Sequence, residues 1–226
     1  NVDSLNIKSY VIPDITFCLE PDKERGKELL NKIRNINPTR STVGVFLNDC
    51  VSARFDSSIL KFMEAEKVKL ELARFLESLP YNILFIPMSY VPPDDRRISL
   101  DVIGKMHKGF KYTCLTEELI PQDCLDIISA LDFGITMRLH ASIFCTIAGV
   151  PFIDLTHHDK SRGYLQSIEH SDYLVDYYEL SNKNLGNKFR LMEQHKDVIS
   201  EKLLAIKRSN KVLLRETIQN VHLLSK

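Results

Sequence analysis

DFGITMRLHASIFCTIAGVP, residues 132–151, contains two apolar segments separated by a polar turn. Residues 133–137 are typical of a buried strand, and residues 140–148 are typical of an apolar helix. Arg138 and His140 lie in the turn between the two segments. A strand followed directly by a helix is the repeating unit of an α/β sheet, and the turn between them lies at the carboxyl end of the strand, where ligands bind.

The same alternation of strands and helices continues in both directions along the chain. Short runs rich in β-branched and aromatic residues predict strands at residues 43–47, 82–87, 111–115, 133–137, 152–155 and 173–175. Helical periodicity predicts helices at 22–35, 57–79, 99–107, 121–131, 140–148 and 161–168, and one long or two shorter amphipathic helices over 184–224. This pattern predicts an α/β fold: a doubly wound, mostly parallel Rossmann-like sheet with helices on both faces.

The predicted elements divide the chain into three segments. Residues 1–38 are expected to be a lead-in segment and linker helix from a preceding domain of the same polypeptide, because the sequence opens on Asn1 like a piece of a longer chain. Residues 39–180 are expected to form the Rossmann-like C-terminal domain, and residues 181–226 amphipathic helices that pack on it. SYVPPDDRR (89–97) is predicted to be an exposed loop, stiffened by its two prolines.

Composition limits the classes of partner. Thirty basic residues balance thirty acidic ones, so no global charge favours nucleic acid or an anionic membrane. The five cysteines form no CxxC pair, which argues for reduced thiols and against a cysteine-based zinc site. The longest apolar run is shorter than a membrane span and no signal peptide precedes it, so we expect a cytoplasmic protein without a transmembrane segment.

The turn at residues 138–140 is the candidate for chemistry. The first turn of a helix offers unpaired N–H groups and a partial positive charge, and an arginine beside it can grip phosphate or carboxylate with two parallel hydrogen bonds. Imidazole can donate a proton near neutral pH. The alternative is structural: Arg138 and His140 would then cap a neighbouring helix or pair with a surface carboxylate.

Several short motifs follow one another in an order typical of one family. They are Asp132 before the strand, MRLHA at 137–141, GVP at 149–151 and Lys160 after the next strand, preceded near the start of the chain by the Pro-Asp-x-x-Phe segment in VIPDITF at 11–17. With these motifs, the chain resembles the polysaccharide pyruvyl transferase family, most specifically over residues 115–168.

The resemblance implies a transferase of GT-B-like architecture, built from two Rossmann-type halves, of which this chain supplies the C-terminal half. Phosphoenolpyruvate would be the donor substrate, no cofactor would be needed, and the pyruvyl group would move as a ketal onto a sugar diol of a glycan or lipid-linked sugar. Arg138 would bind the phosphate or carboxylate of the donor, and His140 would be the general acid. Lys160, Glu117 and His157 are further donor-binding candidates at the same edge. No metal is expected, and the isolated half should turn over little.

Two positions depart from the family pattern. Asn48 stands after the first strand where the family often has an arginine, and Met88 stands after the second strand where a histidine is common. These departures keep two other functions open. One is a nucleotide-sugar-dependent glycosyltransferase of GT-B architecture, although the sequence lacks a glycine-rich phosphate loop. The other is a catalytically lapsed half that acts as a binding module.

Overall fold

A parallel sheet of six strands forms the centre of the protein, in the order β3-β2-β1-β4-β5-β6. The computed structural model describes residues 12–48, 59–107, 112–156 and 159–224. The strands are β1 (Thr42–Phe46), β2 (Asn82–Phe85), β3 (Tyr112–Cys114), β4 (Phe133–Thr136), β5 (Phe152–Thr156) and β6 (Leu174–Asp176). Each lies where the sequence predicts a strand. The predicted fold, a doubly wound Rossmann-like sheet, is confirmed.

The middle strands are buried on both faces, as their continuous apolar sequences require. Every residue of β1, β2, β4 and β5 is buried. In the centre of the sheet, Val43 lies opposite Phe133 and Val45 opposite Ile135. Because all strands run the same way, their carboxyl ends share one edge of the sheet, and the loops that could hold a ligand gather there.

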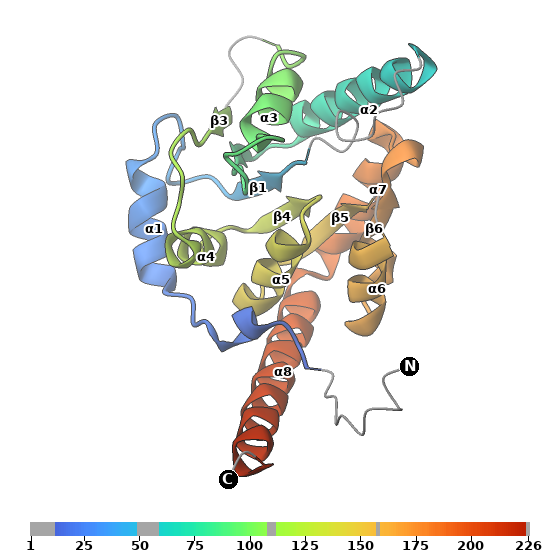
Figure 1. The fold of residues 1–226 in the computed structure, drawn as a ribbon. Coiled ribbons are helices and arrows are strands. Elements are labelled where there is room, and N and C mark those ends of the chain that lie inside the picture. Colours follow the sequence, from blue (N-terminus) through green and yellow to red (C-terminus); the bar gives the residue numbers. More distant parts are fainter. Residues whose placement is uncertain (1–11, 49–58, 108–111, 157–158, 225–226) are drawn as a thin grey trace.

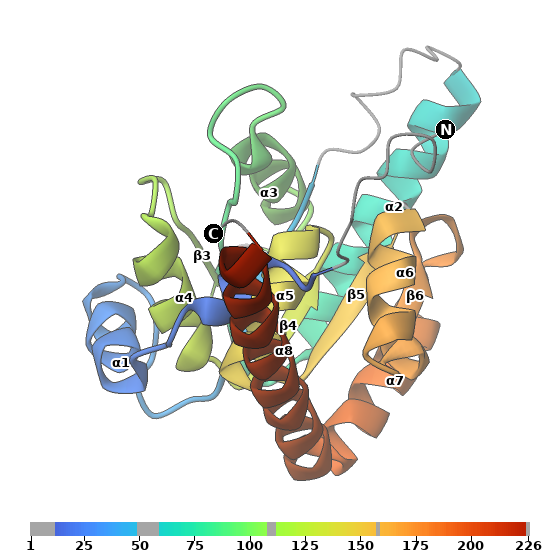
Figure 2. The ribbon, with the colours of Figure 1, turned by 60° about the horizontal axis from the view of Figure 1, so that its bottom comes forward.

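Helices cover both faces of the sheet (Figures 1 and 2). Helices α2 (Ile59–Ser78), α3 (Asp95–Ile103) and α7 (Asn182–Gln194) pack together on one face. On the other face lie α1 (Lys23–Lys32), α4 (Pro121–Ser129), α5 (Leu139–Ala148), α6 (Asp159–Ser167) and α8 (Lys196–Leu224). The amphipathic pattern predicted over 184–224 is therefore two helices, α7 and α8. The far end of α8 projects past the rest of the domain (Figure 1).

The predicted helix at 99–107 begins and ends earlier than expected. Helix α3 starts at Asp95, and the Asp94 carboxylate accepts a hydrogen bond from the Arg96 N–H as its N-cap. The exposed loop predicted for residues 89–97 is therefore wrong at its carboxyl end, where Asp95 is completely buried. The two prolines are consistent with a helix that begins at Asp95, because they directly precede the capping residue Asp94 and so lie outside the helix.

The segment before the first strand packs closely on the sheet's helical layer. A Cβ atom on Gly26 of α1 would lie only 1.9 Å from the Asp126 carbonyl oxygen of α4. The short 3₁₀ helix η2 (Ile15–Cys18) contacts α5 and α8, and it buries Phe17. Glu20, just after η2, forms ion pairs with Lys207 and Lys211 of α8. Residues 12–38 are thus part of the same packed unit as the sheet.

The turn after α5 explains the GVP motif. Gly149 ends α5 in the left-handed region at φ 68°, which favours glycine. A Cβ atom there would also lie 2.7 Å from Leu204 of α8. Gly149 therefore allows both the turn into β5 and the close approach of α8.

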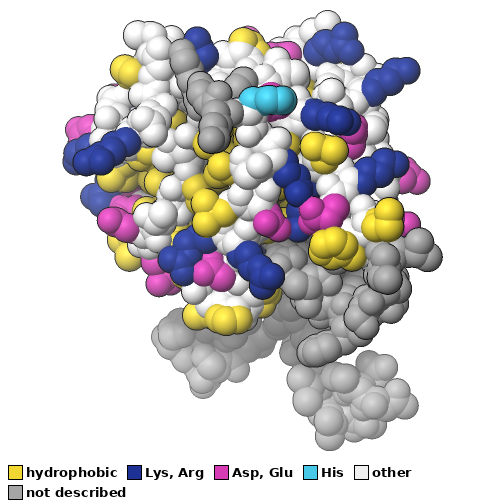
Figure 3. All heavy atoms as spheres, turned by 90° about the horizontal axis from the view of Figure 1, so that it is seen from above, with side chains coloured by type: hydrophobic (Ala, Val, Ile, Leu, Met, Phe, Trp, Pro, Cys, Tyr) yellow, Lys and Arg dark blue, Asp and Glu magenta, His cyan; other side chains and the backbone are white. Residues whose placement is uncertain are grey.

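Figure 3 shows the face of the protein that is at the top in Figure 1, and on it the described positive and negative side chains are interspersed. Apolar side chains lie between them, and no large patch of one sign dominates this face. Of the helices in the described ranges, none combines the length and apolar character needed to cross a bilayer.

Candidate active site

A pocket of about 300 Å³ lies at the carboxyl edge of the sheet, between the loops after β2 and β3 and the first turns of α4 and α5. It is lined by Thr16, Pro87, Met88, Tyr90, Glu118, Leu119, Pro121, Cys124, Arg138, His140 and Phe144. The two residues predicted for chemistry, Arg138 and His140, therefore lie on the same pocket.

The MRLHA turn alternates between the core and the pocket. Met137 and Ala141 are buried, and Leu139 packs against the core. The Met137 N–H donates to the Phe46 carbonyl at 2.8 Å, which carries the strand ladder one residue beyond β4. The apolar members anchor the turn, and this anchoring leaves Arg138 and His140 on the side of the ligand edge.

Arg138 is held in place by Asp95, the buried first residue of α3. Its Nε and Nη2 atoms donate to the two Asp95 carboxylate oxygens at 3.0 and 2.5 Å. The Met88 and Ser89 N–H groups also donate to Asp95. Burial raises the pKa of Asp95, and the Arg138 guanidinium opposes that rise. Arg138 is thus oriented by a bidentate pair that does not use its Nη1 atom, and its side chain stays 27% exposed.

His140 stands at the mouth of the pocket, in the first turn of α5, with 62% of its side chain exposed. Its Nε2 atom lies 3.8 Å from the Asp14 carboxylate, an ion pair that forms only when the ring is protonated. Asp14 comes from the Pro-Asp-x-x-Phe segment and is fixed by hydrogen bonds from the Thr16 N–H and hydroxyl at 2.9 and 2.6 Å. The lead-in segment therefore supplies an acidic partner for the candidate general acid.

The three predicted donor-binding residues other than Arg138 lie outside this pocket or outside the described residues. Lys160 is exposed in the first turn of α6 and does not line the pocket. Glu117 is exposed, and its neighbour Glu118 lines the pocket instead. His157 falls outside the described residues. Among the described histidine, cysteine, aspartate and glutamate side chains, no group of three is arranged to hold a metal ion.

The two departures from the family pattern have different surroundings. Met88 lines the pocket, and its sulfur lies 3.6 Å from the Cys124 thiol, so this wall is apolar. Burial raises the pKa of Cys124 to about 12, which keeps it a neutral thiol. Asn48 follows β1, is partly buried and does not line the pocket. Of these two departures from the family pattern, Met88 is therefore the one that lies in the pocket and makes its wall less polar.

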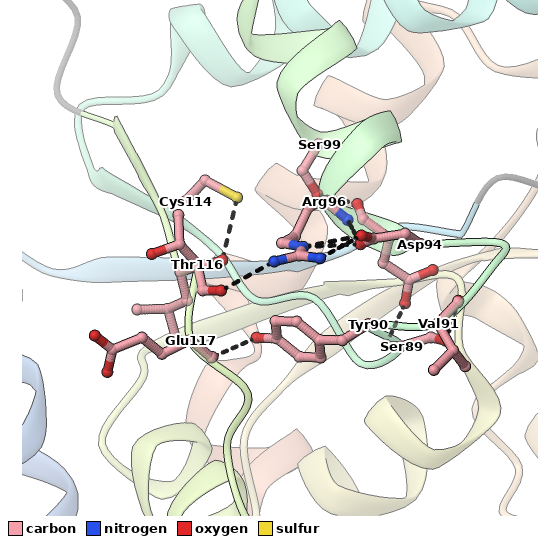
Figure 4. Close-up of polar contacts among 11 residues, drawn as sticks. Ser89, Tyr90, Val91, Asp94, Arg96, Ser99, Cys114, Thr116 and Glu117 are labelled. Carbon is pink, nitrogen blue, oxygen red and sulfur yellow. Dashed lines mark hydrogen bonds and ion pairs between the residues drawn. The ribbon is translucent and has the colours of Figure 1, made fainter.

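A network of hydrogen bonds ties the loop after β2 to the loop after β3 (Figure 4). The Tyr90 hydroxyl donates to the Glu117 carbonyl at 2.6 Å. Arg96 pairs with Asp94 at 2.6 Å and also donates to the Thr116 carbonyl at 3.3 Å. The two loops thus form one connected wall of the pocket.

A second buried polar cluster supports the turn from beneath. Asp154 of β5 accepts hydrogen bonds from the Ser142 hydroxyl at 2.7 Å and the Thr136 hydroxyl at 3.1 Å. Its other oxygen, Oδ1, has no hydrogen-bond partner among the described residues. Burial raises the pKa of Asp154 to about 6. The Ser142 N–H donates to the Arg138 carbonyl at 3.2 Å, so the cluster is connected to the turn at its backbone.

Another residue of the recognised motif lies away from the pocket. Asp132 precedes β4, and its carboxylate accepts from the Thr42 N–H at 2.9 Å and pairs with Lys196 of α8 at 2.8 Å. This position is the amino end of the strand, at the edge opposite the ligand edge. Asp132 therefore joins β1, β4 and α8 and has no contact with the pocket.

Comparison with known proteins gives one family and one fold. The family model for polysaccharide pyruvyl transferase matches residues 2–159. No curated protein sequence matches the chain.

Solved structures resemble the chain at low sequence identity. A structure of EarP, described as mediating arginine glycosylation of translation elongation factor EF-P, has a TM-score of 0.56 at 11% identity, covering 96% of this chain and 73% of that one. A trehalose 6-phosphate synthase from Burkholderia multivorans has a TM-score of 0.55 at 14% identity, over 90% and 47%. The C-terminal domain of the group 1 glycosyl transferase LpcC from Francisella tularensis has 0.50 at 12%, over 90% and 97%.

These coverages fit the predicted architecture. The chain spans about half the length of the synthase and nearly all of the isolated C-terminal domain. The prediction of one Rossmann-like half of a GT-B-type fold is confirmed.

Proposed function

Because the chain belongs to the polysaccharide pyruvyl transferase family, we propose that it moves the pyruvyl group of phosphoenolpyruvate onto two hydroxyls of a sugar as a ketal. The observation that carries this proposal is the MRLHA turn, which places Arg138 and His140 on one pocket at the carboxyl end of β4. The sugar belongs to a glycan or lipid-linked acceptor, and a second domain of the same polypeptide forms the opposite wall of the cleft.

The reaction assigns one proton transfer to His140. The imidazolium donates its proton to the methylene carbon of phosphoenolpyruvate, which becomes the methyl group of the product. The central carbon then accepts one sugar hydroxyl, its bond to the phosphate oxygen breaks, and the second hydroxyl closes the ketal. Of the two hydroxyl protons, one replaces the proton that His140 gave and the other leaves with inorganic phosphate. The Asp14 carboxylate, 3.8 Å from Nε2, is the acidic side chain that faces this imidazole.

Arg138 binds and orients the donor. The Asp95 carboxylate fixes the guanidinium through Nε and Nη2, which leaves Nη1 for an oxygen of the donor carboxylate or phosphate. The N–H groups in the first turn of α5 lie beside it and add a partial positive charge. Lys160, in the first turn of α6 at the same edge of the sheet, adds a cation when the donor is bound. His157 and Glu117 stay candidates for further donor contacts.

Donor titration of the protein tests this proposal. We expect phosphoenolpyruvate to bind the wild type and to bind Arg138→Ala about ten- to a hundredfold more weakly, because one charge-assisted hydrogen bond contributes about 1.5–3 kcal/mol. Arg162→Ala is the matched control, since Arg162 of α6 pairs with Asp176 of β6 and does not line the pocket. His140→Gln should bind the donor and lose proton transfer to it, measured as loss of deuterium incorporation at the methyl group. Equal affinities of wild type and Arg138→Ala would contradict the proposal.

A second candidate function is a nucleotide-sugar-dependent glycosyltransferase. The apolar wall with Tyr90, Met88 and Leu119 favours it, because a nucleobase can stack against such a wall. The likeness to solved glycosyltransferases extends to the fold alone. Thermal-shift measurements with a panel of nucleotide sugars alongside phosphoenolpyruvate separate the two functions. Binding of neither class would favour a catalytically lapsed binding module.

A further inference from the structure

Tyr90 is an aromatic side chain of the pocket that the proposed chemistry does not use. It follows β2 on the loop before α3 and lines the pocket together with Arg138 and His140. The proton transfer and the anion contacts above need no phenol. A function for this ring must come from how it is held and from what surrounds it.

Two contacts fix the Tyr90 ring from outside the pocket. Its hydroxyl donates to the Glu117 carbonyl at 2.6 Å, and the Arg96 guanidinium lies over the ring at 5.1 Å from the centroid (Figure 4). Arg96 is itself held by the Asp94 carboxylate. Burial raises the pKa of Tyr90 to about 12, so the phenol keeps its proton and its hydrogen bond at neutral pH. The Tyr90 ring is therefore fixed in position and uncharged, and its hydroxyl already has a hydrogen-bond partner.

The residues around the Tyr90 ring suit a ligand that is apolar on one face and carries hydroxyls at its edge. Arg96 covers one side of the ring, and the pocket continues to Leu119, Pro121 and Phe144 of the neighbouring loop and helices. Besides Tyr90, Cys124, Arg138 and His140, the lining residues with polar side-chain groups are Glu118 and Thr16.

The charge and size of the pocket narrow the ligand class further. Glu118 follows Glu117, whose carbonyl holds the Tyr90 hydroxyl, so it brings a negative charge to the Tyr90 side of the pocket, and this charge disfavours a diphosphate there. The volume of about 300 Å³ is at the lower end of the range for small-molecule sites. Both features favour a neutral ligand of one ring over a nucleotide sugar.

We propose that Tyr90 is the stacking platform for the pyranose ring of the acceptor, with the Glu118 carboxylate and the Thr16 hydroxyl oxygen accepting hydrogen bonds from its hydroxyls. The C–H groups on one face of a pyranose carry partial positive charge and are attracted to the negative face of an aromatic ring. This inference rests on the proposed function, because it places the acceptor beside Arg138 and His140, where the donor carbon must receive two hydroxyls.

Saturation-transfer difference NMR with simple methyl glycosides tests the platform, and phosphoenolpyruvate titration of the same samples tests the donor site. For Tyr90→Leu we expect the saturation transfer to the ring C–H protons of the glycoside to fall at least fivefold, while the donor Kd changes by less than twofold. Tyr90→Phe keeps the ring and loses only the bond to Glu117, so it should retain most of the transfer. Tyr178→Leu is the matched control, since Tyr178 is an exposed tyrosine outside the pocket. Urea unfolding confirms that each variant is folded.

The outcomes separate the two proposals. Glycoside signals that depend on Tyr90 in a protein that does not bind phosphoenolpyruvate would support the platform and overturn the proposed donor. Equal signals from Tyr90→Leu and Tyr178→Leu, or no glycoside signal from the wild type, would overturn the platform. Binding of uridine diphosphate that Tyr90→Leu abolishes would also overturn it, in favour of a nucleobase on the same ring.

Discussion

Two fully buried aspartates lie on either side of the first turn of α5, and they are held in opposite ways. Asp95 meets a guanidinium and two backbone N–H groups. Asp154 meets only the hydroxyls of Ser142 and Thr136, and one of its oxygens has no partner among the described residues. Both are completely inaccessible to solvent. The same residue type therefore has two different electrostatic environments within one site.

The difference shows which carboxylate serves the pocket and which supports it. A buried charge is tolerated when a cation and N–H donors compensate it, and this is the situation of Asp95. Hydroxyls compensate a negative charge less completely, and burial raises the pKa of Asp154 to about 6. Asp95 thus orients a charged group at the ligand edge, whereas Asp154 braces the turn from inside the fold.

The largest effect is expected from removing the cation that compensates Asp95. Arg138→Met should lower the free energy of unfolding at pH 7.5 by about 3 kcal/mol, because breaking a buried pair leaves its partner uncompensated. Without Arg138 the raised pKa of Asp95 lets the folded state bind a proton more tightly than the unfolded chain. The loss should therefore shrink as the pH falls.

Urea unfolding of wild type, Arg138→Met and the exposed-pair control Arg162→Met at pH 5.5 and 7.5 measures this effect. Equal losses in the two arginine variants would show that the Asp95 pair has no special weight in the fold.

A smaller effect, with a clear pH signature, is expected at the other aspartate. Because burial raises the pKa of Asp154 from 3.8 to about 6, its contribution to stability is complete below about pH 3.8 and is lost as the pH rises through 6. Asp154→Asn cannot ionise. Relative to this variant, the free energy of unfolding of the wild type should fall by about 2 kcal/mol between pH 4 and pH 8.

Denaturant titrations of both proteins across that range check the prediction, with the exposed Asp197→Asn as the control. A constant difference between wild type and Asp154→Asn would mean that Asp154 is charged in the folded protein.

The smallest effect is expected from one of the hydroxyls that serve Asp154. Ser142→Ala removes the 2.7 Å hydrogen bond to the carboxylate and should cost about 1 kcal/mol at pH 5. The cost should grow toward pH 8, because the charged carboxylate depends on that hydrogen bond more than the neutral acid does. Ser167→Ala, which removes an exposed hydroxyl bonded to the Tyr164 carbonyl, is the control and should change stability less. If Ser142→Ala costs the same free energy of unfolding at pH 5 and at pH 8, the protonation state of Asp154 does not change over this range.

The sequence predicted the sheet well because buried parallel strands are continuous apolar runs. The sequence also predicted that Arg138 and His140 share one turn at the ligand edge, because the apolar residues on either side of each face the core. It missed Asp95, because DDRR after two prolines has the composition of a loop. The signal that could have revealed it is the paired aspartate: Asp94 caps α3, and the next residue then points inward.

The remaining site residues depend on contacts between distant segments. Asp14 reaches His140 across more than a hundred residues of sequence, and Tyr90 reaches Glu117 from a different loop. No local periodicity encodes such contacts. Asp132 illustrates the converse, because it belongs to the recognised motif and yet its partners, Thr42 and Lys196, lie at the opposite edge of the sheet. A residue of the motif can therefore serve the fold without contacting the pocket.

The long C-terminal helix has a practical consequence for anyone who shortens this protein. Glu20 is clamped to α8 by Lys207 and Lys211, and α8 also covers Gly149 at the end of α5. Cutting the chain back to residues 39–180 would keep every strand and still remove Thr16 from the pocket wall, Asp14 from His140 and the helix that backs both. A shortened chain that keeps the pocket must therefore include both η2 and α8, because contacts between these two segments support the pocket wall. The bounds of the sheet alone would suggest too short a chain.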